Sequence, residues 1–194
     1  MNTRDKFKRL GSLVGLVSAS LLLSFPLHAQ YLPRFTFWQR PAYLESEDEI
    51  NLAEIIAQES QFTIFADSLE KAGLSKTLEG NGYLTVLAPT NQAFNALSFT
   101  DSQKLSQPEY LKKVLKYHLI EGEINPQEIP VEKLTLAGSL VKITFGKSSQ
   151  NEFWVNNQAQ VIPLDVDEND NPKAKFADNA TIVPINKVLL PPEF

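Results

Sequence analysis

Apolar residues in the first half of the chain recur every three or four positions, the spacing that predicts amphipathic helices. Phe62, Phe65, Leu69 and Ala72 fall on one face of such a helix, and Gly73 is the residue type that commonly ends one. We therefore expect a helix here that buries its aromatic face.

Residues 107–121 form the clearest predicted helix. Pro108 suits its first turn and Gly122 its end. One stripe of this helix is apolar apart from a histidine: Leu111, Val114, Leu115 and His118. Its lysines point elsewhere: Lys112, Lys113 and Lys116. We therefore expect the histidine on the buried side.

A short apolar strand is predicted over 84–88, and Pro89 stops it. Thr90 or Asn91 can then cap a short helix, because their side-chain oxygens accept hydrogen bonds from unpaired backbone N–H groups. We expect this local role rather than direct binding, and we expect Phe94 in the core.

Beyond Pro130 the apolar period changes to two, which predicts strands. The expected strand segments are 134–136, 140–145, 153–155, 159–164 and 181–190. Asn156 and Asn157 suit a hairpin turn, because asparagine tolerates positive φ. Pro184 predicts an edge or a bulge in the last strand. Helices followed by strands indicate an α+β domain.

Residues 1–29 have the three parts of a secretory signal peptide. A basic start containing Arg4 and Lys6 precedes an apolar stretch over 10–25, and Leu27-His28-Ala29 offers a cleavage site. The alternative is an uncleaved membrane anchor, but the stretch is shorter than the ~20 residues that a spanning helix needs. We expect export, to the periplasm, the medium or the cell surface, and no integral membrane segment after cleavage.

Residues 30–49 are predicted to form an N-terminal arm that is aromatic at first and acidic towards its end. Phe37 and Trp38 lie in its aromatic part. The arm either docks on its own domain or remains exposed, in which case its aromatic side chains are candidates for partner binding.

Charge and composition exclude several functional classes. The chain of 194 residues has a formal charge of −5 and no cysteine. Removing residues 1–29 takes away four of its 18 basic and one of its 23 acidic residues, which leaves 14 against 22 and a charge of −8. Nucleic-acid binding is therefore not expected. Disulfides and thiolate metal sites are excluded.

The sequence contains none of the common catalytic signatures, so we expect no enzyme activity, no catalytic residue, no metal and no cofactor. Asp165, Asp167 and Asn169 resemble the start of a calcium loop. Asp170 stands where such a loop needs glycine, however, and Phe176 where it needs glutamate. An acidic solvated loop is the preferred interpretation.

Several segments together resemble the fasciclin domain, in that family's order and over about residues 50–192. They are Thr85 to Phe94, Tyr117-His118, Leu134 to Gly138, Val155 to Val161 and Val188 to Pro191. The resemblance implies an α+β fold, a β-wedge or sandwich of short strands with helices packed on one side. It also implies extracellular adhesion or matrix attachment. In animal members, integrins are engaged through the tyrosine–histidine region.

Tyr117 and His118 are therefore candidate adhesion residues. The apolar stripe favours a structural histidine. Tyr117 points about 100° away from it around the helix, so we expect the tyrosine to be the exposed residue of the pair. The other signature residues are expected to be structural: Thr85, Pro89, Thr90, Asn91, Phe94, Asn156 and Asn157.

The closing strand departs from the family pattern. Ala180, Val183 and Asn186 replace its usual glycine, histidine and aspartate. An activity that needs those side chains is therefore in doubt, although the apolar pattern of the strand is preserved.

We expect a secreted binding domain that acts in adhesion or in organising the cell surface or matrix. Its partner would be a cell-surface protein or polysaccharide, including a second copy of this chain. Two alternatives remain open, which are a carrier of an apolar small molecule such as a carotenoid and a structural envelope protein.

Overall fold

The computed structural model describes residues 52–80, 82–147, 152–162, 165–166, 172–173, 175–177, 180–192 and 194. The chain divides into two units, 1–32 and 33–194, and the described residues all belong to the second. The predicted signal peptide, the arm with Phe37 and Trp38, and Asp167 to Asp170 of the acidic loop lie outside the described residues.

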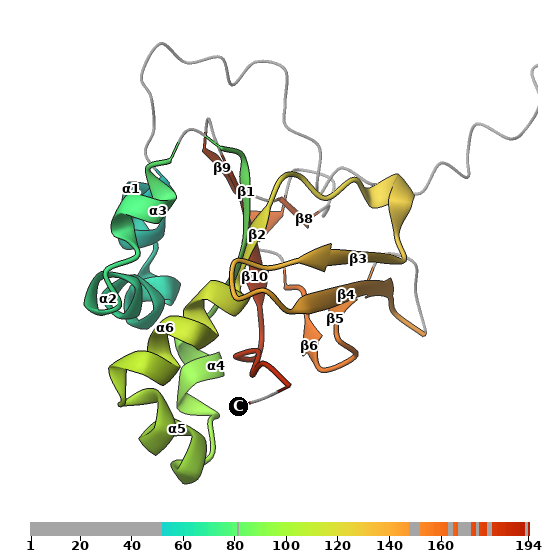
Figure 1. The fold of residues 1–194 in the computed structure, drawn as a ribbon. Helices are drawn as coiled ribbons and strands as arrows, with labels where there is room; N and C mark the ends of the chain where they lie inside the picture. The colour runs from blue at the N-terminus through green and yellow to red at the C-terminus, as the bar shows by residue number, and fades with distance from the viewer. Residues whose placement is uncertain are drawn as a thin grey trace, which may run out of the picture. The chain divides into compact units, whose positions relative to one another are not determined.

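The α-helices of the described residues gather on one side of the strands (Figure 1). They are α1 Leu52–Gln58, α2 Thr63–Lys71, α3 Ser75–Leu78, α4 Asn91–Asn95, α5 Phe99–Leu105 and α6 Pro108–Tyr117, with the 3₁₀ turns η3 Ser60–Phe62 and η4 Pro126–Glu128. Helix α2 buries Phe65 and Leu69, as the spacing predicts. Gly73 follows it with φ of +66°, and the Leu74 N–H donates to the Leu69 carbonyl at 3.0 Å, which confirms the predicted cap.

The strands of the described residues form two four-stranded sheets and a two-stranded ribbon. They are β1 Leu84–Pro89, β2 Leu119–Glu121, β3 Val131–Leu134, β4 Leu140–Phe145, β5 Phe153–Val155, β6 Ala159–Gln160, β7 Asp165–Val166, β8 Pro172–Lys173, β9 Lys175–Ala177 and β10 Ala180–Ile185. The first sheet has the order β2–β1–β10–β9 and the second β3–β4–β5–β6, and the ribbon pairs β7 with β8. The predicted α+β class is confirmed.

The two middle strands of the first sheet are buried on both faces. Its middle strands, β1 and β10, run parallel, and every residue of both is buried. Along β1, Leu84, Val86 and Ala88 pack with the residues of α1 and α2, whereas Leu87 packs with the second sheet. A strand with two covered faces needs apolar residues on both, which explains why 84–88 is apolar apart from the buried Thr85.

The helix predicted over 107–121 extends too far at its C-terminal end. Helix α6 ends at Tyr117, and residues 119–121 form β2, antiparallel to β1. The Leu87 N–H donates to the His118 carbonyl at 2.9 Å, so pairing begins where the helix stops. The local sequence suits either structure, and the neighbouring strand decides between them. Gly122, with φ of +84°, ends this strand rather than the helix.

Pro184 does not mark an edge strand, because β10 lies between β1 and β9. The register of β9 covers only Ala180–Ile182, however, and beyond it the Pro184 carbonyl accepts from the Ile162 N–H at 2.9 Å. The N–H and C=O of one strand residue face the same neighbour. The side on which proline lacks an N–H is therefore the side away from β1, and the β1 ladder is unaffected.

Helix α5 was missing from the sequence-based prediction. The Ser98 hydroxyl caps it by accepting from the Asp101 N–H at 3.0 Å, and this hydroxyl also donates to the Asp101 carboxylate at 2.6 Å. A serine three residues before an aspartate was the available signal. The apolar spacing gave no such signal. Phe99, in the first turn, is 84% exposed and does not belong to a buried face of the helix.

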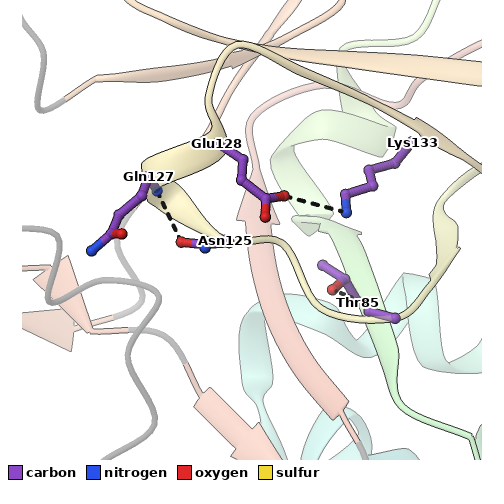
Figure 2. A network of polar contacts seen from close by, with 6 residues as sticks. Thr85, Asn125, Gln127, Glu128 and Lys133 are labelled. Atoms are coloured by element: carbon purple, nitrogen blue, oxygen red, sulfur yellow. Dashed lines mark hydrogen bonds and ion pairs between the residues drawn. The ribbon is translucent and has the colours of Figure 1, made fainter.

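The connection between β2 and β3 is held by local polar contacts (Figure 2). The Gln127 N–H donates to Asn125 Oδ1 at 3.0 Å, which fixes the start of η4. Lys133 Nζ lies 3.9 Å from Glu128 Oε2, which ties η4 to β3. The first contact is exposed and the second only partly covered, so they define the path of the connection more than they stabilise the fold.

Candidate functional site

His118 caps the C-terminus of α6 and is completely buried. Its Nδ1 lies 2.8 Å from the Val114 carbonyl oxygen, and the Leu189 N–H donates to its Nε2 at 3.0 Å. Because Nε2 accepts, we assign the proton of the neutral ring to Nδ1, which donates to Val114. The predicted burial of this histidine is confirmed, and the ring joins α6 to the segment after β10.

Burial lowers the pKa of His118 from 6.5 to about 4, and the hydrogen bond to Val114 opposes that shift with a smaller effect. The centroids of the Phe65 and His118 rings lie 6.2 Å apart. A protonated ring would also direct an N–H from Nε2 at the Leu189 N–H. The imidazole is therefore neutral at pH 7, with both nitrogens engaged, and in this conformation neither is available as a catalytic base or a metal ligand.

The expectation that Tyr117 is exposed is wrong. Its side chain is 1% exposed, and its hydroxyl donates to the Leu140 carbonyl at 3.1 Å and accepts from Asn156 Nδ2 at 3.0 Å. The second sheet covers this side of α6, with Val141 and Ile143 in the same core cluster. Tyr117 therefore has no exposed face to offer a partner in this structure.

Asn156 and Asn157 form the turn between β5 and β6, with φ of +52° and +54°. The predicted hairpin turn is confirmed, since asparagine adopts this conformation at lower cost than most residues. Asn156 Oδ1 also accepts from the Lys142 N–H at 2.8 Å. This side chain therefore links the turn to β4 and to Tyr117.

Thr90 and Asn91 cap different helices, although the sequence did not distinguish their roles. Thr90 Oγ1 accepts from the Ala93 N–H at 3.3 Å and caps α4. Asn91 instead serves α2, because its Oδ1 accepts from the Ile64 N–H at 3.0 Å and its Nδ2 donates to the Ser60 carbonyl at 2.9 Å. The purely local role expected for Asn91 is therefore wrong, and the side chain holds two helices together.

The remaining signature residues also serve the frame of the domain. Thr85 on β1 donates its hydroxyl to the Gly122 carbonyl at 2.8 Å, and Figure 2 shows it beside the start of the β2–β3 connection. Pro89 is the last residue of β1. Phe94 is half-buried and packs against two core clusters, so it is less enclosed than expected.

Residues 60–191 match the family model of the Fasciclin domain. The chain belongs to the fasciclin-domain family. Its geometry agrees with a solved structure, the FAS1 domain pair from the insect cell adhesion molecule Fasciclin I. The TM-score is 0.55 at 13% identity, and the match covers 74% of this chain and 51% of that one. At this identity the likeness shows the fold alone.

Relatives of this fasciclin domain come from bacteria and animals. It is 32% identical over 153 residues to protein sll1483 of Synechocystis sp., covering 76% of this chain and 77% of that protein. It is 30% identical over 145 residues to the transforming growth factor-beta-induced protein ig-h3 of Sus scrofa, covering 72% and 19%. It is 32% identical over 120 residues to the cell surface glycolipoprotein MPB83 of Mycobacterium bovis, covering 61% and 48%. The chain spans half or less of the length of the last two.

The residues expected to depart from the family pattern serve packing or strand pairing in the structure. Ala180 and Val183 are buried in β10. Asn186 exchanges two contacts with Gln160, because its Oδ1 accepts from that residue's N–H at 2.8 Å and its own N–H donates to the carbonyl at 3.0 Å. The three replacements thus complete the core and anchor β6.

The exposed apolar side chains of this fasciclin domain include a pair that sequence reasoning missed. Leu134 on β3 and Leu140 on β4 lie directly opposite each other and are 58% and 56% exposed. The sequence pattern placed both in strands but did not show which face they occupy. Leucines at matching positions on either side of the Ala137-Gly138 turn were the available signal.

Within the described residues, no group of three or more histidine, cysteine, aspartate or glutamate side chains is placed to hold a metal ion. No helix in that part of the chain is long and apolar enough to cross a membrane.

Proposed function

We propose that this chain is an exported, non-catalytic fasciclin domain that binds at the cell surface or in the extracellular matrix. In this proposal residues 1–29 are removed, 30–49 form an arm and 50–192 form the domain. Its membership of the family supports the proposal, as does a relative named a cell surface glycolipoprotein.

The observation that carries the proposal is the exposed pair of Leu134 and Leu140. Directly opposite residues of two antiparallel strands have side chains in contact on one face. Single exposed leucines are ordinary, but two adjacent ones form the apolar centre that a protein interface needs. The exposed Glu132 and Lys142 lie on the same face and provide a polar rim, with Lys142 Nζ 3.8 Å from Glu132 Oε1.

Tyr117 supports this surface from below. Its hydroxyl holds the Leu140 carbonyl, and Asn156 holds that hydroxyl in turn. The tyrosine of the family signature would then affect adhesion by positioning the leucine pair rather than by touching the partner.

The experiment is retention of the purified protein on the host's own cells and extracellular matrix, with a heat-unfolded sample as the first control. We expect saturable binding of the folded protein only. Leu134→Ser/Leu140→Ser should weaken it strongly. Phe99→Ser should not, because Phe99 is exposed and apolar but lies on α5 rather than on the β3–β4 hairpin. Equal retention of both variants would contradict the assignment of the surface. Phe37→Ala/Trp38→Ala tests the arm in the same assay.

A second candidate function is transport of an apolar small molecule, and one groove favours it. The groove has a volume of about 410 Å³ and lies among α2, α4, α5 and α6. Its apolar lining consists of Phe94, Leu97, Leu105 and Leu111. This volume falls within the range of small-molecule sites. Organic extraction of natively isolated protein should then release a bound apolar compound, and an empty extract would contradict transport.

A further inference from the structure

A cleft of about 520 Å³ lies on the outer side of α6, opposite the buried histidine stripe. The end of α2, the face of α6 and the turn between β3 and β4 line it. Its charged side chains are four lysines and one glutamate: Lys71, Lys112, Lys113, Lys116 and Glu109. The remaining lining residues are Ala72, Pro108, Leu136 and Ala137.

Three of the cleft lysines, Lys71, Lys112 and Lys116, form a concentration of like charge. Lys112 and Lys116 are four residues apart on one helix, a spacing at which like charges repel. Lys71 reaches the same cleft from α2. Lys133 pairs with Glu128 and Lys142 with Glu132, whereas Lys71, Lys112 and Lys116 form no ion pair with a carboxylate of the described residues.

This basic cleft stands out because the rest of the chain is acidic. The whole sequence has a formal charge of −5, and the chain without residues 1–29 has −8. In a chain of net negative charge, this group of lysines gives the cleft a local positive charge that attracts an anionic ligand.

We propose that this cleft binds an acidic polysaccharide, a chain that carries carboxylate or sulfate groups along its length. The proposal rests on the proposed function in the cell surface or matrix, and it names a ligand class for that function. It adds a second surface, separate from the leucine pair. Half-buried Lys113 and Lys116 have part of their stems covered, so they lose less freedom on binding than fully exposed lysines would.

The lining favours a polysaccharide over a nucleic acid or a membrane. None of the cleft residues is aromatic, so bases would have nothing to stack on. Lysine ammonium groups act as separate point charges, which suit carboxylates or sulfates spaced along a flexible chain. A cleft with lysines along its walls suits a polymer that enters it better than a flat bilayer surface.

The test measures the affinity of the purified protein for immobilised polygalacturonate and dextran sulfate, with neutral dextran as a blank. The cleft variant is Lys112→Gln/Lys116→Gln. The matched control is Lys76→Gln/Lys187→Gln, which changes the net charge equally at exposed lysines outside the cleft. We expect about a tenfold loss of affinity in the cleft variant, less than twofold in the control, and weaker wild-type binding at high salt.

Equal losses in the two variants would show a general charge effect and overturn the proposal, and so would absence of wild-type binding to either acidic polymer. Tighter, cleft-dependent binding to phosphatidylglycerol vesicles would overturn it in favour of a membrane. One outcome is that the wild-type protein binds host cells and the cleft variant binds host cells and both polymers equally tightly. In that case the cleft proposal fails and the surface function stands. If the polymers are bound through the cleft but host cells are not, the surface function fails instead.

Discussion

The two faces of α6 use the same ten-residue helix for different purposes. The inner face buries Val114, Leu115 and the neutral His118, whose ring nitrogens are both engaged. The outer face presents Lys112 and Lys116 to a cleft that the fold leaves positively charged. The inner face favours the folded state, whereas the outer face slightly opposes it.

This difference shows that the signature residues of the domain stabilise its fold rather than form its surface. Tyr117 and His118 carry the family signature, yet both are enclosed. The surfaces available to partners are built from less distinctive residues, the leucine pair and the cleft lysines. Substitutions that separate stability from binding therefore test the comparison.

The largest expected effect follows from removing the inner-face histidine. His118→Ala should lower the free energy of unfolding by about 4 kcal/mol, because it leaves a cavity and a buried Leu189 N–H without an acceptor. Urea unfolding measures this change. Lys116→Ala on the outer face is the control, and equal midpoints for His118→Ala and wild type would contradict the structural role.

Acid should produce the next largest effect. The pKa of His118 is about 4 in the folded state and 6.5 when the ring is free, so the unfolded chain binds the proton more tightly. The contribution of neutral His118 to the free energy of unfolding is complete above pH 6.5. About 3 kcal/mol of it is lost as the pH falls towards 4.

Unfolding free energies measured from pH 7 to 4 test this pH dependence. His118→Gln is the control, because it lacks the titrating ring but retains the carboxylates that also titrate in acid. The same slope in both proteins would mean that the histidine does not cause it.

Tyr117→Phe should have a smaller effect, a loss of about 1 kcal/mol. It removes one hydroxyl, which leaves the Leu140 carbonyl and Asn156 Nδ2 short of a partner while the ring remains packed. Thermal unfolding measures the loss, and polygalacturonate binding should be unchanged because the tyrosine does not line the cleft. Weakened polymer binding without loss of stability would reverse our assignment of the two faces.

The smallest effect on stability is expected on the outer face. Lys112→Gln/Lys116→Gln should change the unfolding free energy by less than about 0.5 kcal/mol, with relief of repulsion offsetting lost contacts. The same variant should lose most of its binding to acidic polymers. A large drop in stability would mean that these lysines belong to the frame as well.

Local chemistry made part of the fold predictable. The boundaries of β4 and β5 were predicted correctly because alternating residues bounded by turn formers specify short strands. The cap of α2 and the asparagine turn at 156–157 were predicted because each requires a residue that tolerates positive φ. The buried histidine followed from its place on an apolar stripe.

Contacts between distant segments were not predictable in the same way. The end of α6 depends on β1, which pairs with the residues just beyond Tyr117. Asn91 caps a helix that begins 28 residues earlier in the chain, at Thr63. No local pattern contains either partner.

The sequence by itself determined the family, the α+β class and the buried side of α6, because periodicity and turn chemistry act over a few residues. Only the tertiary structure decided that Tyr117 is covered, because a second sheet packs where the helix alone would leave the side chain exposed. It also decided that Lys71 joins the lysines of α6. Helix packing brings charges together without regard to their separation along the chain, and that assembly creates the cleft.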